Sequence, residues 1–297
     1  LTANTTGAAN TAVGRNALGA NTTANDNVAV GEGALETNTT GALNTAVGKS
    51  ALAANTTASS NQAFGRRALY ANTTGTENSA FGYLALLANT TGSYNTAIGN
   101  NALAANTDTD SKTAVGYAAL AANTTGIYNT AVGVNSLASN TTASSNTSIG
   151  HKALYANTTG GYNVAVGADT LDASTTGSSL TGLGYGALSA NTTASNNTAV
   201  GNSSLLSTTS GGQNTAVGKD ALKLNTASEN TAVGTYSLDA NTTGGNNCAV
   251  GYGSLGANTT GGQNTTVGHS SLDANTTGVD NVAVGYSSLG AQTTASY

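Results

Sequence analysis

The chain of 297 residues has no proline, no methionine and no tryptophan, and it has two phenylalanines and a single cysteine. Charged residues make up only 7% of it. Large apolar side chains fill the core of an ordinary globular domain, and such a core cannot be built from this composition. Disorder is disfavoured as well, because disordered chains combine high net charge with few apolar residues. Valine, isoleucine and leucine return here at fixed places, so order must come from repetition.

Other absences restrict the partners. The formal net charge of −5 is spread thinly, and without a basic stripe to follow a phosphate backbone we expect no nucleic-acid partner. No apolar run approaches the roughly 18 residues of a membrane-spanning helix, so we expect no membrane insertion of this segment. The lone Cys248 excludes an internal disulfide. It stands where other repeats have threonine or valine, and we interpret it as a packed thiol rather than a reactive one.

What the chain does contain is a repeat. A glycine that ends an Asn-Thr-Ala-Val-Gly stretch, or a close relative, recurs every 17 residues, except for one interval that is a residue shorter, and this self-similarity decides the architecture. These glycines are Gly14, Gly31, Gly48, Gly65, Gly82, Gly99, Gly116, Gly133, Gly150, Gly167, Gly184, Gly201, Gly218, Gly234, Gly251, Gly268 and Gly285. Composition does not shift along the chain, so we expect one continuous array over residues 1–297. Both ends fall inside a repeat, and we expect a segment of a longer chain.

Each repeat contains two stretches that we interpret as short strands. Asparagine, threonine, glycine and valine are poor helix formers, and no apolar period of 3.6 residues occurs. The first stretch is Asn-Thr-Ala-Val-Gly, and the second reads Ala-Leu-x-Ala-Asn-Thr-Thr. A unit of this size cannot bury its own apolar face, so it must stack on its copies. The sequence predicts an all-β chain: a parallel β-solenoid, or β-roll, of about 17 coils with one 17-residue repeat and two short strands per coil.

Alternation of side chains along these strands predicts two columns in the core or at an interface. The first strand is restricted on both faces, so we expect one face toward the coil interior and the other toward a neighbouring chain. The second strand is expected to direct leucine and the first threonine, such as Thr56, inward. The predicted core and interface columns are Val13, Val30, Val47, Phe64, Phe81, Ile98 and Val115, and Leu18, Leu35, Leu52, Leu69, Leu86 and Leu103.

Asparagine occurs in both turns of nearly every repeat. It tolerates a left-handed backbone, and stacked amides can bond to the coils above and below. The Asn-Thr-Thr triplets also match the acceptor pattern for N-glycosylation. We interpret them as a ladder of amides, and a glycan coat on exposed asparagine or threonine is the alternative.

Two sets of outward residues are candidates for surface contacts. Five tyrosines follow the repeat glycine directly and are either sugar-stacking or incidental surface residues. The second threonine of Asn-Thr-Thr forms an outward column, the arrangement that an ice-binding solenoid uses. The candidates are Tyr83, Tyr117, Tyr185, Tyr252 and Tyr286, and Thr23, Thr40 and Thr57.

Nothing in the sequence indicates catalysis. His151 and His269 are nearly seven repeats apart, and both stand at a permissive position after a repeat glycine. No nucleophile, base and carboxylate are placed together. Asp108 and Asp110 interrupt one turn and could hold a cation loosely, but no glycine-rich calcium repeat surrounds them. We expect neither an enzyme nor a bound cofactor or metal.

The Asn-Thr-Ala-Val-Gly strand resembles the Ser-Val-Ala-Ile-Gly repeats in the heads of YadA-like trimeric autotransporter adhesins, and the whole repeat is similar to those of phage tail-fibre-like proteins. The resemblance implies a homotrimeric extracellular β-roll, used as a stalk or adhesin at a cell surface or on a virion appendage. The partners it implies are copies of the chain itself, as a trimer or filament, and a cell-surface glycan or receptor. A structural fibre is thus the first functional hypothesis, and an ice-binding solenoid is the alternative.

Overall fold

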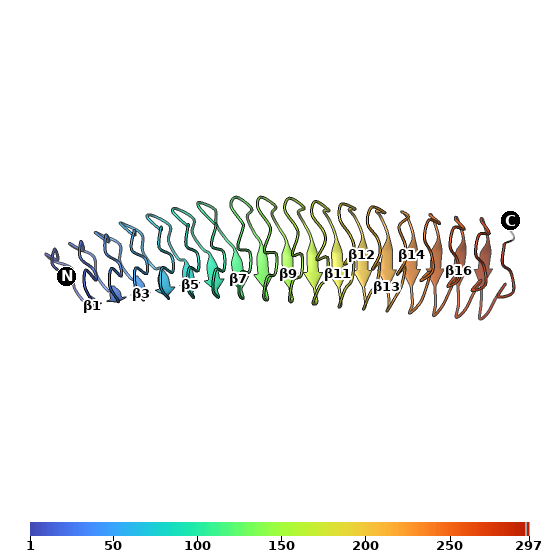
Figure 1. The fold of residues 1–297 in the computed structure, drawn as a ribbon, viewed down its shortest axis with the longest axis horizontal. Coiled ribbons are helices and arrows are strands. Elements are labelled where there is room, and N and C mark those ends of the chain that lie inside the picture. Colours follow the sequence, from blue (N-terminus) through green and yellow to red (C-terminus); the bar gives the residue numbers. More distant parts are fainter. Residues whose placement is uncertain (295, 297) are drawn as a thin grey trace. The chain divides into compact units, whose positions relative to one another are not determined.

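The structure, a computed structural model, describes residues 1–294 and 296 (Figure 1). Within these residues the chain forms 17 strands of three residues each and no helix. It divides into two compact units, Leu1–Asn146 and Thr147–Tyr297. The prediction of an all-β parallel solenoid with one 17-residue repeat per coil is confirmed.

The first unit contains β1 to β8. Each strand pairs in parallel with the next one in the chain, and equivalent residues of successive repeats lie side by side. The strands are β1 Thr11–Val13, β2 Val28–Val30, β3 Thr45–Val47, β4 Gln62–Phe64, β5 Ser79–Phe81, β6 Thr96–Ile98, β7 Thr113–Val115 and β8 Thr130–Val132.

The second unit contains β9 to β17, which pair in the same parallel register. The strands are β9 Thr147–Ile149, β10 Val164–Val166, β11 Thr181–Leu183, β12 Thr198–Val200, β13 Thr215–Val217, β14 Thr231–Val233, β15 Cys248–Val250, β16 Thr265–Val267 and β17 Val282–Val284.

In each strand the middle residue points into the coil and the two outer residues point away from it. In β3, Ala46 is fully buried, whereas Thr45 and Val47 are partly exposed. Gly48 follows with φ of 132°, and a Cβ on it would lie 2.6 Å from the carbonyl oxygen of Gly65. Only glycine fits this corner, which explains why it recurs in every repeat.

The second predicted strand is absent, so the prediction of two strands per coil is wrong. The stretch around Leu52 forms turns, with Ser50 and Leu52 in the left-handed region at φ of 55° and 51°. A strand needs consecutive extended residues, and left-handed residues at alternate places bend the chain instead. This half of the coil must turn because the chain has to return to the next strand. Its backbone still bonds between coils, since the N–H of Leu52 donates to the carbonyl of Ala68 at 3.0 Å.

The core is a column of leucines beside columns of alanines. Alanines such as Ala46 and Ala51 are fully buried against this column. Burial of a leucine side chain stabilises a fold by about 1.5–3 kcal/mol, so the repeated leucine is the main apolar contribution. Every leucine of the predicted column is buried at 0% exposure, namely Leu18, Leu35, Leu52, Leu69, Leu86 and Leu103.

The valine column, predicted to lie in the core or at an interface, lies outside this core. Val13 is 56% and Ile98 42% exposed. The physical reason is the width of the coil. A Cβ on Gly182, which takes the place of the middle alanine in β11, would already lie 3.3 Å from Leu171 Cδ1. The interior has room only for a small side chain at the middle of the strand, which is alanine in most strands, Ser148 in β9 and Thr266 in β16, so the larger side chains point outward.

Two columns of buried asparagines hold the turns together. Asn55 Nδ2 donates to Asn38 Oδ1 at 2.8 Å and to the carbonyl of Ala58 at 2.9 Å. In the other column, Asn44 Oδ1 accepts the backbone N–H of Asn61 at 3.0 Å. These amides are inaccessible to solvent, and buried polar groups need such partners. The ladder of amides predicted from the sequence is present.

The threonine after the buried asparagine does not point into the core. Thr56, predicted to lie inward beside Leu52, is partly exposed, and its Oγ1 donates to the carbonyl of Thr73 at 3.2 Å. Asn55 takes the buried place instead. Alternation by two residues fails here because the segment is not extended.

One coil shows how tightly the interior is filled. Residue 170 is a threonine where most coils of the first unit have alanine, and the middle residue of β11 is Gly182 where other strands have mostly alanine. A Cβ on Gly182 would lie 2.6 Å from Thr170 Cγ2. The larger and the smaller side chain occur together because close-packed interiors leave no spare volume.

We predict that Gly182→Ala destabilises the second unit by about 1–3 kcal/mol, because the added methyl group overlaps Thr170. Thr170→Ala in the same chain should recover most of that loss. Denaturant unfolding of the wild type, both single variants and the double variant measures the coupling. An equal effect of Gly182→Ala in both backgrounds would contradict this account.

Candidate functional site

The outer side chains of the strands form the most regular surface of each unit, here called the sheet face. It consists of the first and third residue of every strand. The first is usually threonine, and the third is valine, isoleucine, phenylalanine or leucine. None of these residues is charged in the strands that the structure describes. Strands in a sheet lie about 4.8 Å apart, so the sheet face presents two continuous ranks within each unit.

The apolar rank of the sheet face is reachable from outside. Phe81 is 37% and Ile98 42% exposed, and the rank is broadest at Phe64 and Phe81, whose rings stack with centroids 4.7 Å apart and planes 6° from parallel. The remaining members of the predicted column, Val30, Val47, Phe64 and Val115, are partly exposed.

The predicted threonine column lies in turns rather than in the sheet. Thr23, Thr40 and Thr57 are all exposed and follow the half-buried threonine of each Asn-Thr-Thr triplet. Exposed threonine therefore occurs on two surfaces, in these turns and in the first rank of the sheet face.

The predicted tyrosines are exposed, and in the second unit two of them, Tyr252 and Tyr286, stack on a histidine. The ring of His269 lies between Tyr252 and Tyr286, with centroids 5.0 Å and 5.2 Å away and planes within 23° of parallel. His269 covers one face of the Tyr252 ring, and the Tyr236 ring meets Tyr252 at 90° with the centroids 5.8 Å apart. This arrangement disfavours Tyr252 as a sugar-stacking residue. The exposed fractions are 42% for Tyr83, 52% for Tyr117, 59% for Tyr185, 51% for Tyr252 and 79% for Tyr286.

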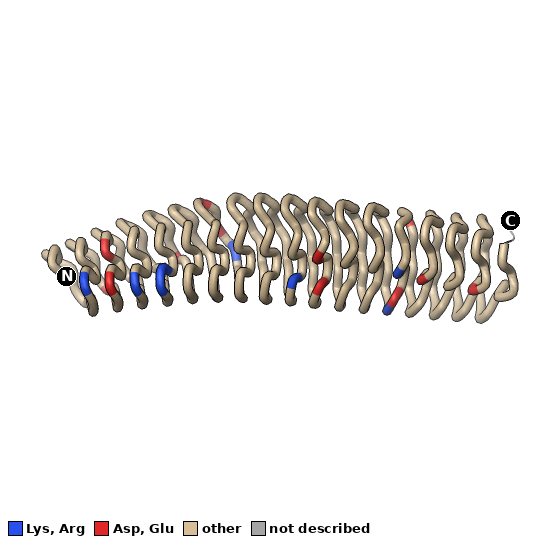
Figure 2. Tube along the Cα trace, viewed as in Figure 1, with Lys and Arg blue, Asp and Glu red and all other residues tan. Residues whose placement is uncertain are grey.

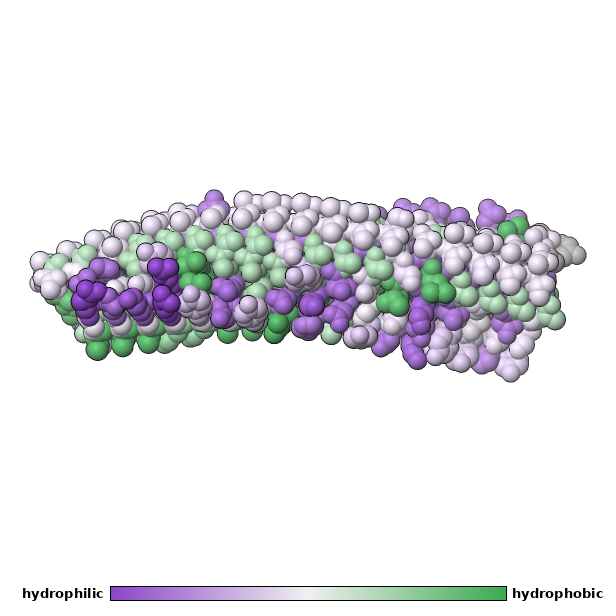
Figure 3. Space-filling model, in the orientation of Figure 1, coloured by the Kyte–Doolittle hydropathy of each residue, from purple (hydrophilic) through white to green (hydrophobic). Residues whose placement is uncertain are grey.

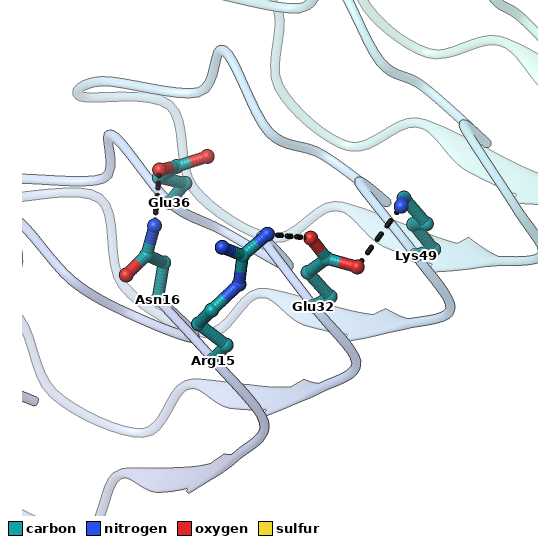
Figure 4. A network of polar contacts seen from close by, with 5 residues as sticks. All are labelled: Arg15, Asn16, Glu32, Glu36 and Lys49. Carbon is teal, nitrogen blue, oxygen red and sulfur yellow. Dashed lines mark hydrogen bonds and ion pairs between the residues drawn. The ribbon is translucent and has the colours of Figure 1, made fainter.

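Charged side chains of the first unit line up at the position after the repeat glycine (Figure 4). Glu32 accepts a hydrogen bond from Arg15 of the preceding coil and pairs with Lys49 of the following coil at 2.9 Å. Hydrogen bonds from Lys49 and Arg15 hold the pKa of Glu32 down at about 2. The sequence alone could have revealed this row, because alternating charges at 17-residue intervals fall on neighbouring coils.

The candidates for catalysis and metal binding are not brought together. His151 Nδ1 lies 3.7 Å from Asp169 Oδ1 on the surface, and His269 is part of the ring stack. Cys248 is partly exposed on the sheet face, so it does not lie in the core. Among the described residues no three histidine, cysteine, aspartate or glutamate side chains are grouped so that they could hold a metal ion.

Lys112 takes the place of a ladder asparagine and is buried. Its Nζ donates to Thr109 Oγ1 at 2.5 Å and to the carbonyl of Asp110 at 3.3 Å, and the side chain is 1% exposed. Burial lowers the pKa of Lys112 to about 8, against the opposing attraction of Asp110 and Asp108. The interrupted turn thus surrounds an ammonium group of the chain itself.

We predict that Lys112→Asn stabilises the chain at pH 7 by on the order of 1 kcal/mol, because it restores the ladder hydrogen bonds and removes a buried charge. The folded pKa of about 8 lies below the ordinary value of 10.5, so the unfolded chain binds more protons between these values. Wild-type stability should therefore rise with pH across this window relative to Lys112→Asn.

Denaturant unfolding at pH 7 and pH 10 tests this prediction, with the exposed Lys152→Asn as control. A difference between wild type and Lys112→Asn that does not change with pH would contradict it.

The Asn-Thr-Thr triplets are poor acceptors for a glycan in the folded chain. An N-linked sugar replaces one hydrogen on Nδ2, yet both hydrogens of Asn55 Nδ2 are used in bonds to Asn38 and Ala58. The equivalent Asn38 and Asn72 make the same two bonds. The ladder is therefore the better interpretation of this column.

Comparisons with protein-family models, with curated proteins and with solved structures found no match to this chain. The resemblance to YadA-like adhesin heads and to phage tail-fibre-like repeats stays a prediction. No helix long and apolar enough to cross a membrane occurs among the described residues.

Proposed function

We propose that this chain is a structural, non-catalytic part of an extracellular fibre or adhesin stalk, in which copies of the chain pack through their sheet faces. One observation carries the proposal: the sheet face is uncharged in every described strand and directs its larger apolar side chains outward. Side chains such as Val47 and Ile98 gain nothing from solvent, whereas a second sheet face would bury them. A homotrimer or a filament of copies fits this surface.

The size of the sheet face fits this proposal. A three-residue strand offers about 50 Å², so the eight strands of the first unit offer roughly 400 Å² and the nine of the second roughly 450 Å². Each unit would thus supply about half of the 800 Å² that each partner of a typical stable complex buries. Sheets that pack face to face interdigitate their side chains at a separation of about 10 Å. The stacked rings of Phe64 and Phe81 are the largest groups available for such packing.

We predict that Phe81→Asp combined with Ile98→Asp abolishes self-association, because two adjacent carboxylates would be buried without partners. The measurement is the molar mass by light scattering, together with circular dichroism to confirm that the variant is folded. Thr40→Asp combined with Thr57→Asp places the same charges on adjacent coils outside the sheet and should leave the mass unchanged. A monomeric wild type, or an assembly that survives the first pair, would refute the proposal.

Ice binding is the second candidate, and exposed threonine in regular rows favours it. Thr45 and its equivalents stand at the spacing of strands in a sheet, and Thr57 and its equivalents stand once per coil. Both rows are rigidly held because the coils bond to one another through their backbones.

Thermal hysteresis of the purified chain tests this candidate. For ice binding we expect a measurable difference between the melting and the freezing temperature. Thr45→Lys combined with Thr96→Lys, both on the sheet face, should reduce this difference. If the chain is a structural fibre, the wild type should show no thermal hysteresis.

A further inference from the structure

Two neighbouring arginines follow β4 and are held against tyrosine rings. The Cζ atom of Arg66 lies 5.7 Å from the centre of the Tyr83 ring in the next coil. The Cζ atom of Arg67 lies 5.3 Å from the centre of the Tyr70 ring in its own coil. Both arginines are exposed, and so are the two rings, at 38% for Tyr70 and 42% for Tyr83. A cation–π contact of this kind attracts a guanidinium group to the ring while leaving it in solvent.

These arginines differ from the other cations of the same edge. Arg15 and Lys49 share the carboxylate of Glu32, whereas Arg66 and Arg67 make no ion pair among the residues described. Each guanidinium carries five N–H donors in one plane and lies near a tyrosine ring. Among the described residues neither group has a carboxylate partner, so its donors are available to an external acceptor.

The turn that holds Arg67 does not require an arginine. Arg67 lies in the left-handed region at φ of 56°, as the equivalent residue does in other coils, and that residue is Asn16, Ser50, Leu84 or Lys152 elsewhere.

The positive charge of these coils is concentrated at Arg66 and Arg67, because residues 1–82 also contain Asp26, Glu32, Glu36 and Glu77 and have no excess of basic side chains. Arg15, Lys49, Arg66 and Arg67 are half of the eight basic residues in the chain, and Figure 2 shows the basic residues near the N-terminal end on neighbouring coils. In Figure 3 hydrophilic residues of these coils lie beside a row of hydrophobic ones. A dense polyanion such as DNA needs many cations along its path. A polymer ligand with widely spaced carboxylates needs only one pair of cations on the protein.

We propose that Arg66, Arg67, Tyr70 and Tyr83 form a binding site for the carboxylate groups of an acidic polysaccharide. The planar donors of arginine match a carboxylate in a bidentate geometry. The tyrosines add hydroxyl groups for the sugar hydroxyls and aromatic surface for its C–H groups. The site uses none of the side chains of the sheet face.

The test uses the full chain and immobilised polygalacturonate, with neutral dextran and double-stranded DNA as comparison ligands. We expect wild-type binding to polygalacturonate that weakens as salt is added, and little binding to dextran. Arg66→Ala with Arg67→Ala should weaken binding at least tenfold. Arg66→Lys with Arg67→Lys keeps the charge but loses the planar donors, and should weaken it several-fold.

The matched control is Lys152→Ala with Lys219→Ala. These lysines also lie over tyrosine rings, with Nζ 6.0 Å from Tyr155 and 5.5 Å from Tyr236, so the pair removes the same charge from similar contacts. Binding should be unchanged. Equal losses in the two alanine pairs, no binding by the wild type, or equally tight binding to dextran or DNA would each overturn the proposal. Unchanged thermal unfolding of every variant confirms that the chains compared are folded.

Discussion

The constraint on which the rest depends is that each residue has its own equivalents as neighbours, one coil above and one below. A residue type persists in a column only if it packs against itself. Glycine does so at the corner after β3, where a Cβ on Gly48 would meet the backbone of Gly65. Asparagine does so in the turns because an amide both donates and accepts. A charge does not, unless its sign alternates from coil to coil as in Arg15, Glu32 and Lys49.

This constraint explains which features could be predicted from the sequence. The period, the parallel stacking, the buried leucines and the amide ladder are properties of columns, and a column is visible in the repeat. The path of the chain within one coil is not. Leu52 has φ of 51°, a conformation that is rare for leucine. The residue types around it therefore do not indicate this turn, and the sequence predicts a strand instead. The direction of the Val47 side chain could not be predicted either. A column whose residues are apolar because they stack on one another looks the same in the sequence as a column whose residues are apolar because they are buried.

Departures from the repeat contain the information that the repeat itself lacks. Thr170 is offset by Gly182, two residues that touch across one coil interior, which identifies that pair as packing. Lys112 is satisfied by Thr109 and by the backbone of its own turn, which makes the interrupted turn self-contained. Arg66 and Arg67 contact tyrosine rings but have no carboxylate partner among the described residues. A charged departure without an opposite charge nearby is where contact with another molecule is expected. The sequence alone could not separate these cases, because it does not show which side chains meet.

The two proposed surfaces differ in their periodicity, and this difference fits them to different partners. The sheet face is nearly the same in every coil, so its natural partner is another periodic surface, such as a second copy. A uniform face specifies register weakly, because a shift by one coil exchanges valine for valine. The stacked Phe64 and Phe81 are larger than the residues around them and occur once. Only an alignment that accommodates both rings buries the whole face, so these two side chains would set the register between copies.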